Sequence, residues 1–284
     1  MKRRWPIWTI LRRTTALGFL AAIVWAARGE VEVFRGSTTA TRLFGVLRLA
    51  DPLAALELQI ASRGVDLALV GAAAVLLVVA ALLGPVFCGW VCPFGLLADL
   101  NGGLRLRLSK WLMRRRRLRL WDWRLPRATR WVALAFVLGM ALTARLPVYQ
   151  AVSPINQVPM ALAFMQHEAW FVIAALLVVE WFVPRVWCRA LCPTGALYAL
   201  VGRWAPLRIR IDRQLAGRSP CRQCSIHCPM GIRVMEDHTL RGKSSIDDLQ
   251  CSRCGNCLEV CMQGVLGWTK KEAGAAPEET APAD

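Results

Sequence analysis

The sequence lacks the motifs on which most soluble enzymes depend. It has no phosphate-binding loop, no dinucleotide-binding fingerprint and no combination of Ser, His and Asp that would indicate a nucleophilic hydrolase. No DNA-binding or signalling module is visible either. These absences argue against hydrolase and kinase chemistry, and they make a sensor or regulator the least favoured interpretation.

Acidic residues are scarce as well. The chain has 19 Asp and Glu against 36 Lys and Arg, a net charge of +17, and its pI is about 10.3. Nucleic-acid binding is the usual first interpretation of such a charge. However, eleven of the basic residues lie within 105–130, between two apolar segments, together with tryptophans and a single acid. This placement predicts a cytoplasmic loop against anionic membrane lipid, and no nucleic-acid partner.

Isolated cysteines are absent, because all 11 belong to four short motifs. Tight spacing and an odd count argue against a secreted disulfide scaffold. Cysteines that carry clusters imply that their part of the chain is assembled on the reducing side of the membrane. The motifs contain Cys88 and Cys92; Cys188 and Cys192; Cys221, Cys224 and Cys228; and Cys251, Cys254, Cys257 and Cys261.

Apolar residues, by contrast, are abundant. A hydrophobic content of 56% and a mean hydropathy of +0.39 predict an integral membrane protein. Four apolar segments predict transmembrane helices, at residues 14–27, 67–87, 131–144 and 169–184. The first is short for a span of about 20 residues, and residues 5–11 extend it if Arg12 and Arg13 reach the interface.

The first segment has a second interpretation. Arg12-Arg13 before an apolar run resembles a twin-arginine signal, so a cleaved leader over residues 1–27 is the alternative to a retained anchor. We expect the anchor to be retained. Cleavage would leave the orientation of the following segments unchanged.

The connecting segments complete the predicted topology. Residues 28–63 predict a polar loop, with a short amphipathic helix over 52–62 at the membrane surface. Residues 146–166, which contain three prolines, predict a loop folded back at the outer surface. The basic residues place 1–13 and 105–130 in the cytoplasm, and four spans return the C-terminal part there. We therefore expect a multi-pass protein of the bacterial inner (cytoplasmic) membrane with both termini cytoplasmic.

These patterns together predict an α-helical polytopic membrane protein with a small C-terminal two-cluster ferredoxin-like domain. Residues 1–203 would form the transmembrane domain, with four helices as two hairpins. Residues 204–270 would form the cytoplasmic ferredoxin-type domain. Residues 271–284 are rich in Ala, Pro and Glu, which predicts a disordered tail.

The strongest chemical motif lies between Cys251 and Cys261. Its spacing, C-x2-C-x2-C-x3-C, is the one that wraps thiolates around a [4Fe–4S] cluster. A structural zinc site is the alternative, but zinc usually takes two separated C-x2-C pairs. The motif therefore predicts a [4Fe–4S] cluster.

The preceding motif, Cys221-x2-Cys224-x2-His227-Cys228-Pro229, is irregular. In two-cluster ferredoxins the last cysteine of each motif ligates the cluster of the other motif. On that pattern Cys228, Cys251, Cys254 and Cys257 hold one cluster. Cys221, Cys224 and Cys261 hold the second, with a fourth ligand that is either His227, a non-protein ligand or a partner residue. A three-iron cluster is the further alternative.

Two further cysteine pairs form an internal repeat. Val86-Phe-Cys88-Gly-Trp-Val-Cys92-Pro93 and Val186-Trp-Cys188-Arg-Ala-Leu-Cys192-Pro193 each follow an apolar segment. A C-x3-C pair in a helix presents both thiols on one face, and the prolines disfavour helix just before themselves. The four thiols would meet at the cytoplasmic membrane surface. They could hold a metal or iron–sulfur centre, form redox-active dithiols, or be packed, reduced cysteines.

Few other polar residues are candidates for catalysis. Glu180 is a carboxylate within a predicted span, which is costly and therefore a functional candidate. It could accept a quinol proton or pair with Arg185. His167 lies near the outer surface, where a quinol head could dock. For both, an interfacial polar residue without catalytic function is the alternative.

The combination of four spans, two C-x3-C-P motifs and two C-terminal ferredoxin motifs resembles the NapH family, the membrane components of quinol dehydrogenases in periplasmic nitrate reduction. It is also similar to the membrane part of NosR proteins and to the MauN ferredoxins of methylamine use. The resemblance covers roughly residues 10–268. It implies that quinol is oxidised at the membrane and that electrons pass through iron–sulfur clusters to another redox subunit, an iron–sulfur or cytochrome protein.

The predicted function is therefore a membrane electron-transfer subunit, the electron-transfer component of a quinol dehydrogenase, which is an oxidoreductase complex. The irregular first motif departs from the family pattern. The alternative function is a non-catalytic accessory protein, such as a maturation factor similar to the CcoG-type cluster proteins, or a regulatory iron–sulfur protein.

Overall fold

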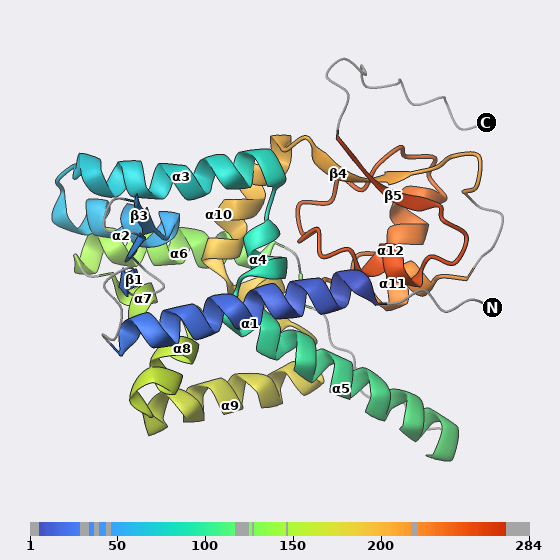
Figure 1. Cartoon of the computed structure of the whole chain (residues 1–284), viewed down its shortest axis with the longest axis horizontal. Helices are drawn as coiled ribbons and strands as arrows, with labels where there is room; N and C mark the ends of the chain where they lie inside the picture. Colours follow the sequence, from blue (N-terminus) through green and yellow to red (C-terminus); the bar gives the residue numbers. More distant parts are fainter. Residues whose placement is uncertain are drawn as a thin grey trace.

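The computed structural model describes residues 6–28, 34–36, 40–43, 47–116, 125–126, 128–145, 147–216 and 221–270. Four helices extend in the same general direction across the molecule, with shorter helices between them (Figure 1). They are α1 (Ile7–Ala27), α3 (Leu67–Leu83), α6 (Thr129–Ala144) and α9 (His167–Phe182). Each lies over one of the four predicted apolar segments. The predicted tail, 271–284, lies outside the described residues.

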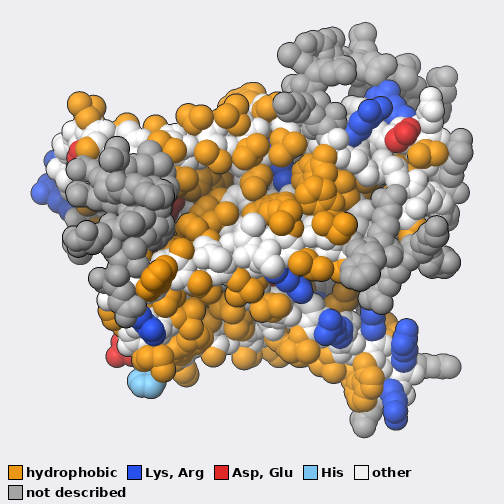
Figure 2. All heavy atoms as spheres, in the orientation of Figure 1, with side chains coloured by type: hydrophobic (Ala, Val, Ile, Leu, Met, Phe, Trp, Pro, Cys, Tyr) orange, Lys and Arg blue, Asp and Glu red, His pale blue; other side chains and the backbone are white. Residues whose placement is uncertain are grey.

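The apolar character of these helices differs in extent. By length and composition, α1 is the one helix in the described part of the chain that could cross a membrane by itself, and α3 and α6 are shorter apolar helices. Large apolar side chains are nevertheless exposed along several of them, as Figure 2 shows on one face of the molecule. They include Val78 and Leu82 on α3, Val132 and Phe136 on α6, and Phe171 and Val178 on α9. Apolar surface of this extent suits a lipid environment.

The second apolar segment is divided where a single helix over 67–87 was predicted. Gly84 has a φ of +79°, a conformation that favours glycine, and Pro85 follows it. Cys88 therefore lies in a separate short helix, α4 (Val86–Trp90). The predicted continuous helix was wrong over its last four residues because the Gly-Pro pair interrupts it.

The segment between the first two long helices contains the helix predicted over 52–62, but strands precede it where only a polar loop was predicted. Strands β1 (Phe34–Gly36), β2 (Ala40–Leu43) and β3 (Leu47–Ala50) form an antiparallel sheet in that order, and α2 (Pro52–Ser62) follows. α2 packs against α3, α6 and α10 (Pro193–Val201), with Leu53 and Glu57 fully buried. Glu57 tolerates burial because the Tyr149 N–H and the Gln150 Nε2 donate to its carboxylate at 3.3 and 3.0 Å.

Residues 147–166 are also helical, where a loop at the outer surface was predicted. α7 (Val148–Val152) leads into α8 (Pro154–Phe164), which packs against α1, α9 and α5 (Pro93–Arg116). Val158 and Ala161 are buried there beside Phe94. The proline signal was misleading, because Pro154 occupies the first turn of α8, where a helix needs no N–H.

Much of the predicted basic loop 105–130 is helical too. α5 continues to Arg116, and its C-terminal half projects away from the other helices (Figure 1). Lys and Arg side chains line this projection (Figure 2). Residues 117–124 lie outside the described part of the chain, so the loop stays a prediction there.

Arg12 and Arg13 both pair with a carboxylate of the fold, and their extension to the membrane interface stays a prediction. Asp99 on α5 forms ion pairs with Arg12 at 2.6 Å, with Arg13 at 2.9 Å and with Arg185 at 3.0 Å. Arg12 is only 5% exposed, and the carboxylate supplies the counter-charge that water would otherwise provide. These ion pairs tie α1 to α5 and to the segment that contains Arg185.

The C-terminal region contains β4 (Leu207–Ile211) paired antiparallel with β5 (Leu266–Lys270), and the short helices α11 (Gln223–Ile226) and α12 (Asn256–Val260). Its core includes Ile209, Ile232, Val234, Ile246 and Leu258. The first residues of α1 dock on this region. The Thr9 N–H and Oγ1 both donate to Glu259 at 2.6 Å, and Trp8 makes edge contacts with Trp90 and Trp268.

Candidate iron–sulfur sites

Four cysteines of the C-terminal region surround one cavity. Cys251, Cys254 and Cys257 come from the loop before α12 and its first turn, and Cys228 follows α11. All four line one cavity, with apolar walls that include Ile209 and Ile232. We call it the ferredoxin cavity. The structure thus brings together the four cysteines that the two-cluster pattern assigns to one cluster.

Burial makes the thiols of the ferredoxin cavity difficult to ionise without a nearby cation. Burial raises the pKa of Cys228 to about 11 and that of Cys251 to about 12. Thiolates in such a place need a compensating positive charge. Iron supplies that charge and deprotonates coordinating thiols.

Cys221, Cys224 and Cys261 form a second group, nearer to solvent. Burial raises the pKa of Cys224, and the neighbouring charges of Cys221 and Cys261 raise it further. Cys221 is exposed. The second set of the two-cluster pattern, with three cysteines, stays a prediction.

His227 was predicted as one possible fourth ligand for this group. Its Nε2 lies 3.4 Å from Nζ of Lys110, and its Nδ1 lies 3.1 Å from the carbonyl oxygen of Gln223. Both ring nitrogens therefore have other partners here. Ligation by His227 stays a prediction.

The spacing indicates a different place for the missing ligand, which the sequence analysis overlooked. Cys221-x2-Cys224-x3-Cys228-Pro229 matches the last three cysteines of C-x2-C-x2-C-x3-C-P. Arg218 then stands where the first cysteine is expected. Alignment from the terminal Cys-Pro, instead of from the first cysteine, would have found it. Residue 218 lies outside the described residues.

The two C-x3-C-P motifs share one local geometry. Cys92 and Cys192 each precede the proline that begins a helix, α5 and α10 respectively. Each Sγ accepts the N–H of the glycine three residues later, Gly95 or Gly195, at 3.3 Å. The helix breaks before both prolines, as their sequence predicts. The two thiols of a pair therefore do not share one helix face.

The repeat extends further than these motifs. Asp51-Pro52 begins α2 and Ser153-Pro154 begins α8, and each of these helices precedes a long helix that leads to a cysteine pair. The sequence analysis missed this part because it compared only the segments around the two cysteine pairs. Both halves of the repeat thus contain a short proline-initiated helix, a long helix and a cysteine pair.

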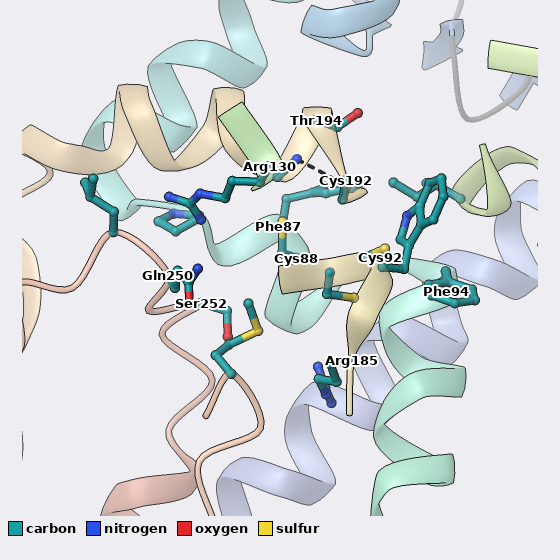
Figure 3. Close-up of a pocket in the computed structure, with 17 residues that line it drawn as sticks. Phe87, Cys88, Cys92, Phe94, Arg130, Arg185, Cys192, Thr194, Gln250 and Ser252 are labelled. Atoms are coloured by element: carbon teal, nitrogen blue, oxygen red, sulfur yellow. Dashed lines mark hydrogen bonds between the residues drawn. The ribbon is translucent and has the colours of Figure 1, made fainter. Parts of the chain in front are cut away.

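All four cysteines of the repeat line one pocket (Figure 3). We call it the four-cysteine pocket. Its walls are mainly apolar, and two buried guanidinium groups, of Arg130 and Arg185, also line it. The C-terminal region closes one side with Met230, Gln250 and Ser252.

Several polar atoms at this pocket have no partner in the described structure. Gln250 is 4% exposed, yet neither its Nε2 nor its Oε1 forms a hydrogen bond, and the same is true of the Trp187 Nε1. Donors and cations around four thiols suit an anionic occupant with acceptor atoms. The sulfides of an iron–sulfur cluster accept hydrogen bonds of this kind.

The two cavities share a wall. Met230 and Ser252 line both of them. Gly89, between Cys88 and Cys92, lies so close that an added Cβ would come within 2.7 Å of the Ser252 carbonyl oxygen and 3.5 Å of the Cys254 Cβ. The first C-x3-C-P motif is thus in direct contact with the cluster-binding loop.

No three His, Cys, Asp or Glu side chains within the described ranges are arranged to hold a single metal ion. The cysteines of the ferredoxin cavity do not form such a group either. This is expected for a four-iron cluster, because its ligands lie farther apart than the ligands of a single ion.

The two predicted catalytic candidates lie far apart. His167 begins α9 and is exposed, whereas Glu180 lies near the other end, 3% exposed. At about 1.5 Å per residue they are separated by roughly 20 Å. Glu180 interacts with Arg185 and Asn101, although the ion pair of Arg185 is with Asp99.

Comparison with known proteins supports the binding of [4Fe–4S] clusters by this chain. A family model described as a 4Fe-4S binding domain matches residues 65–119 and 167–212, which contain both C-x3-C-P motifs. Another, described as a 4Fe-4S dicluster domain, matches residues 219–272. No solved structure matches the chain.

Several curated proteins are similar over most of the chain. The methylamine utilization ferredoxin-type protein MauN of Methylorubrum extorquens is 32% identical over 78% of this chain and 74% of its own length. The ferredoxin-type protein NapH of Escherichia coli is 30% identical over 95% and 91%. The putative electron transport protein YccM of Escherichia coli is 31% identical over 68% and 54%. The coverage and identity, with the cysteine sites above, show that the chain belongs to the NapH and MauN family of ferredoxin-type proteins.

Proposed function

We propose that this chain is a membrane electron-transfer subunit that passes electrons between the quinol pool and a partner redox protein. The wall shared by the four-cysteine pocket and the ferredoxin cavity carries the proposal. Electron transfer between centres requires short separations, and Ser252 and Met230 touch both cavities. The family, whose members are ferredoxin-type proteins, supports the same conclusion.

The proposed topology places residues 1–203 in the membrane as two helical hairpins. Exposed apolar side chains on α3, α6 and α9 support this arrangement, and α2 and α8 would enter the membrane between the long helices. Residues 204–270 would form the cytoplasmic ferredoxin-type domain and 271–284 a tail. The basic helix α5 supports a cytoplasmic position for that end of the molecule.

The ferredoxin-type domain would hold two [4Fe–4S] clusters. Cys228, Cys251, Cys254 and Cys257 would ligate the proximal cluster, beside the membrane pocket. Cys221, Cys224 and Cys261 would ligate the distal cluster, and its fourth ligand is not a cysteine of this chain, because every other cysteine lies elsewhere. Because Cys221 is exposed, the distal cluster would be accessible to a partner.

The membrane pocket would hold a third centre, ligated by Cys88, Cys92, Cys188 and Cys192. Such a cluster, when bound, takes up and releases single electrons. The chain's residues prepare its place: Gly95 and Gly195 N–H groups donate to two of the ligand sulfurs, and Arg185 supplies positive charge. The apolar walls exclude water.

An iron count tests this assignment. The anaerobically purified chain is expected to contain about 12 Fe, since each [4Fe–4S] cluster holds four. Cys88→Ser with Cys192→Ser should lower the count by about four and leave the EPR signals of the ferredoxin clusters in place. A count of about eight in the unaltered chain would remove the membrane centre from the proposal.

Quinol linkage requires a separate measurement. A quinol analogue added to the chain in nanodiscs, together with its partner proteins, should bleach the iron–sulfur absorbance. Absence of bleaching would contradict the proposed electron donor. A maturation role would instead leave a partner enzyme unassembled when this gene is deleted.

A further inference from the structure

The loop from Leu249 to Cys254 has two chemically different sides. Gln250 and Ser252 line the four-cysteine pocket, whereas Cys251 and Cys254 line the ferredoxin cavity. A single short segment therefore separates the two proposed redox centres, and Ser252 reaches both cavities. In Figure 3, Gln250 and Ser252 approach the pocket from the C-terminal region, opposite the cysteines.

The amide of Gln250 is aimed at a partner that this chain does not provide. The side chain is 4% exposed, and neither amide atom forms a hydrogen bond in the described structure. Leaving a buried polar group unsatisfied costs about 1–3 kcal/mol. The backbone of Gln250 is held in place, because its N–H donates to Asp248 Oδ1 at 2.8 Å.

We propose that Gln250 donates a hydrogen bond from Nε2 to the anionic iron–sulfur centre held by Cys88, Cys92, Cys188 and Cys192. The inference rests on the proposed function, which places a centre in that pocket. Gln250 is a positioning residue: it adjoins Cys251, a ligand of the proximal cluster, and reaches across to the membrane centre. The ferredoxin-type domain thereby completes a site whose cysteines all belong to the membrane domain.

This hydrogen bond has a defined electrostatic effect. The reduced state of a cluster carries one more negative charge than the oxidised state, so a donor to its sulfurs stabilises the reduced state more. Hydrogen bonds to the sulfurs are among the factors that set cluster potentials. Removing the Gln250 donor should therefore lower the potential of the membrane centre.

The test is an EPR-monitored redox titration of the full-length chain in nanodiscs, comparing the unaltered protein with Gln250→Met. Methionine keeps the length of the side chain and removes both polar atoms. The reduced-to-oxidised ratio of the membrane centre at a fixed potential should fall about tenfold, which is ~59 mV for a one-electron couple. Signals of the membrane centre are identified by their loss in Cys88→Ser with Cys192→Ser.

Two further variants make the result decisive. Gln250→Glu replaces the donor by an acceptor and should lower the potential of the membrane centre further. This second variant keeps the inference testable if the methionine variant folds poorly. Gln263→Met changes an exposed glutamine near Cys261 and should leave the membrane centre unaltered. A membrane centre whose potential is the same in all three variants overturns this inference and leaves the proposed function intact. Absence of any membrane centre in the unaltered chain overturns both.

Discussion

The guanidinium of Arg253 occupies the space that a side chain at Gly84 would need. A Cβ on Gly84 would overlap the guanidinium atoms of Arg253. Arg253 donates from Nη1 to the Leu83 carbonyl oxygen and from Nη2 to the Gly202 carbonyl oxygen, the latter at 3.2 Å. These carbonyls lie at the C-terminal ends of α3 and α10, where a cation is favourable. Arg253 thus fastens the cluster-binding loop to the membrane domain.

Gly84→Ala should therefore weaken the attachment of the ferredoxin-type domain. The substitution displaces Arg253 and places alanine at a φ of +79°, which together should cost about 2–4 kcal/mol. The measurement is the temperature at which the iron–sulfur absorbance of the anaerobic protein is lost. Gly71→Ala, also in α3, is the matched control because nothing lies within 4 Å of its added Cβ. Equal melting of the two variants would contradict the role of Arg253.

Gly95 and Gly195 occupy equivalent places in the repeat but should respond differently to substitution. A Cβ at Gly95 would lie 2.8 Å from the Cys88 carbonyl oxygen, whereas the nearest atom to a Cβ at Gly195 is the Cys192 Sγ at 3.5 Å. Gly95→Ala should destabilise the protein by about 1–3 kcal/mol, the usual range for overpacking. Gly195→Ala should be nearly neutral. Thermal unfolding of both variants in detergent measures the difference, and similar losses would show that the two halves are equally crowded.

Asp99→Asn should be among the most destabilising substitutions within residues 1–203. It leaves the buried Arg12 and Arg185 without their shared counter-charge. Breaking a buried ion pair by removing one partner typically costs about 3–5 kcal/mol. The comparison is with Glu168→Gln, which neutralises an exposed acid in the first turn of α9. If both variants unfold at the same temperature, the ion pairs contribute little.

His238 should make the stability of the ferredoxin-type domain depend on pH. Burial, followed by the positive charge of Lys243, lowers its pKa from the ordinary value of 6.5, although Asp237, Asp247 and Asp248 act in the opposite direction. The unfolded chain then binds a proton at a higher pH than the folded chain does. Stability should be complete above about pH 6.5 and decrease as the pH falls below it.

His238→Gln provides the check on this dependence. Its unfolding midpoint should decrease less than that of the unaltered protein between about pH 7.5 and pH 5.5. Unfolding of the C-terminal region can be followed by the loss of cluster absorbance. Parallel pH profiles for the two proteins would mean that His238 is not responsible.

The sequence predicted the parts of the structure that depend on local pattern. The apolar runs marked the long helices, and the spacing from Cys251 to Cys261 marked the cluster loop. It could not show that Glu57 is buried, because the donors that satisfy it come from residues 149 and 150, in a distant part of the chain. The same reason applies to Arg12, whose partner Asp99 lies 87 residues away.

The candidate sites were also predicted only in part. Motif spacing identified every cysteine that lines a cavity, and the repeat was visible from its Cys-Pro pairs. Gln250, Ser252 and Arg253 were not found, because nothing in their neighbourhood distinguishes them from other loop residues. Their importance arises from the packing of that loop between two cavities.

The contact between Thr9 and Glu259, across 250 positions, has a consequence for biogenesis. The ribosome delivers α1 first and α12 almost last, yet Trp8 packs against the core around Leu258 and Trp268. The inserted amino-terminal helix must therefore wait for the end of translation before its exposed tryptophan is covered. A chain truncated before Glu259 would therefore leave the first turn of α1 without these partners.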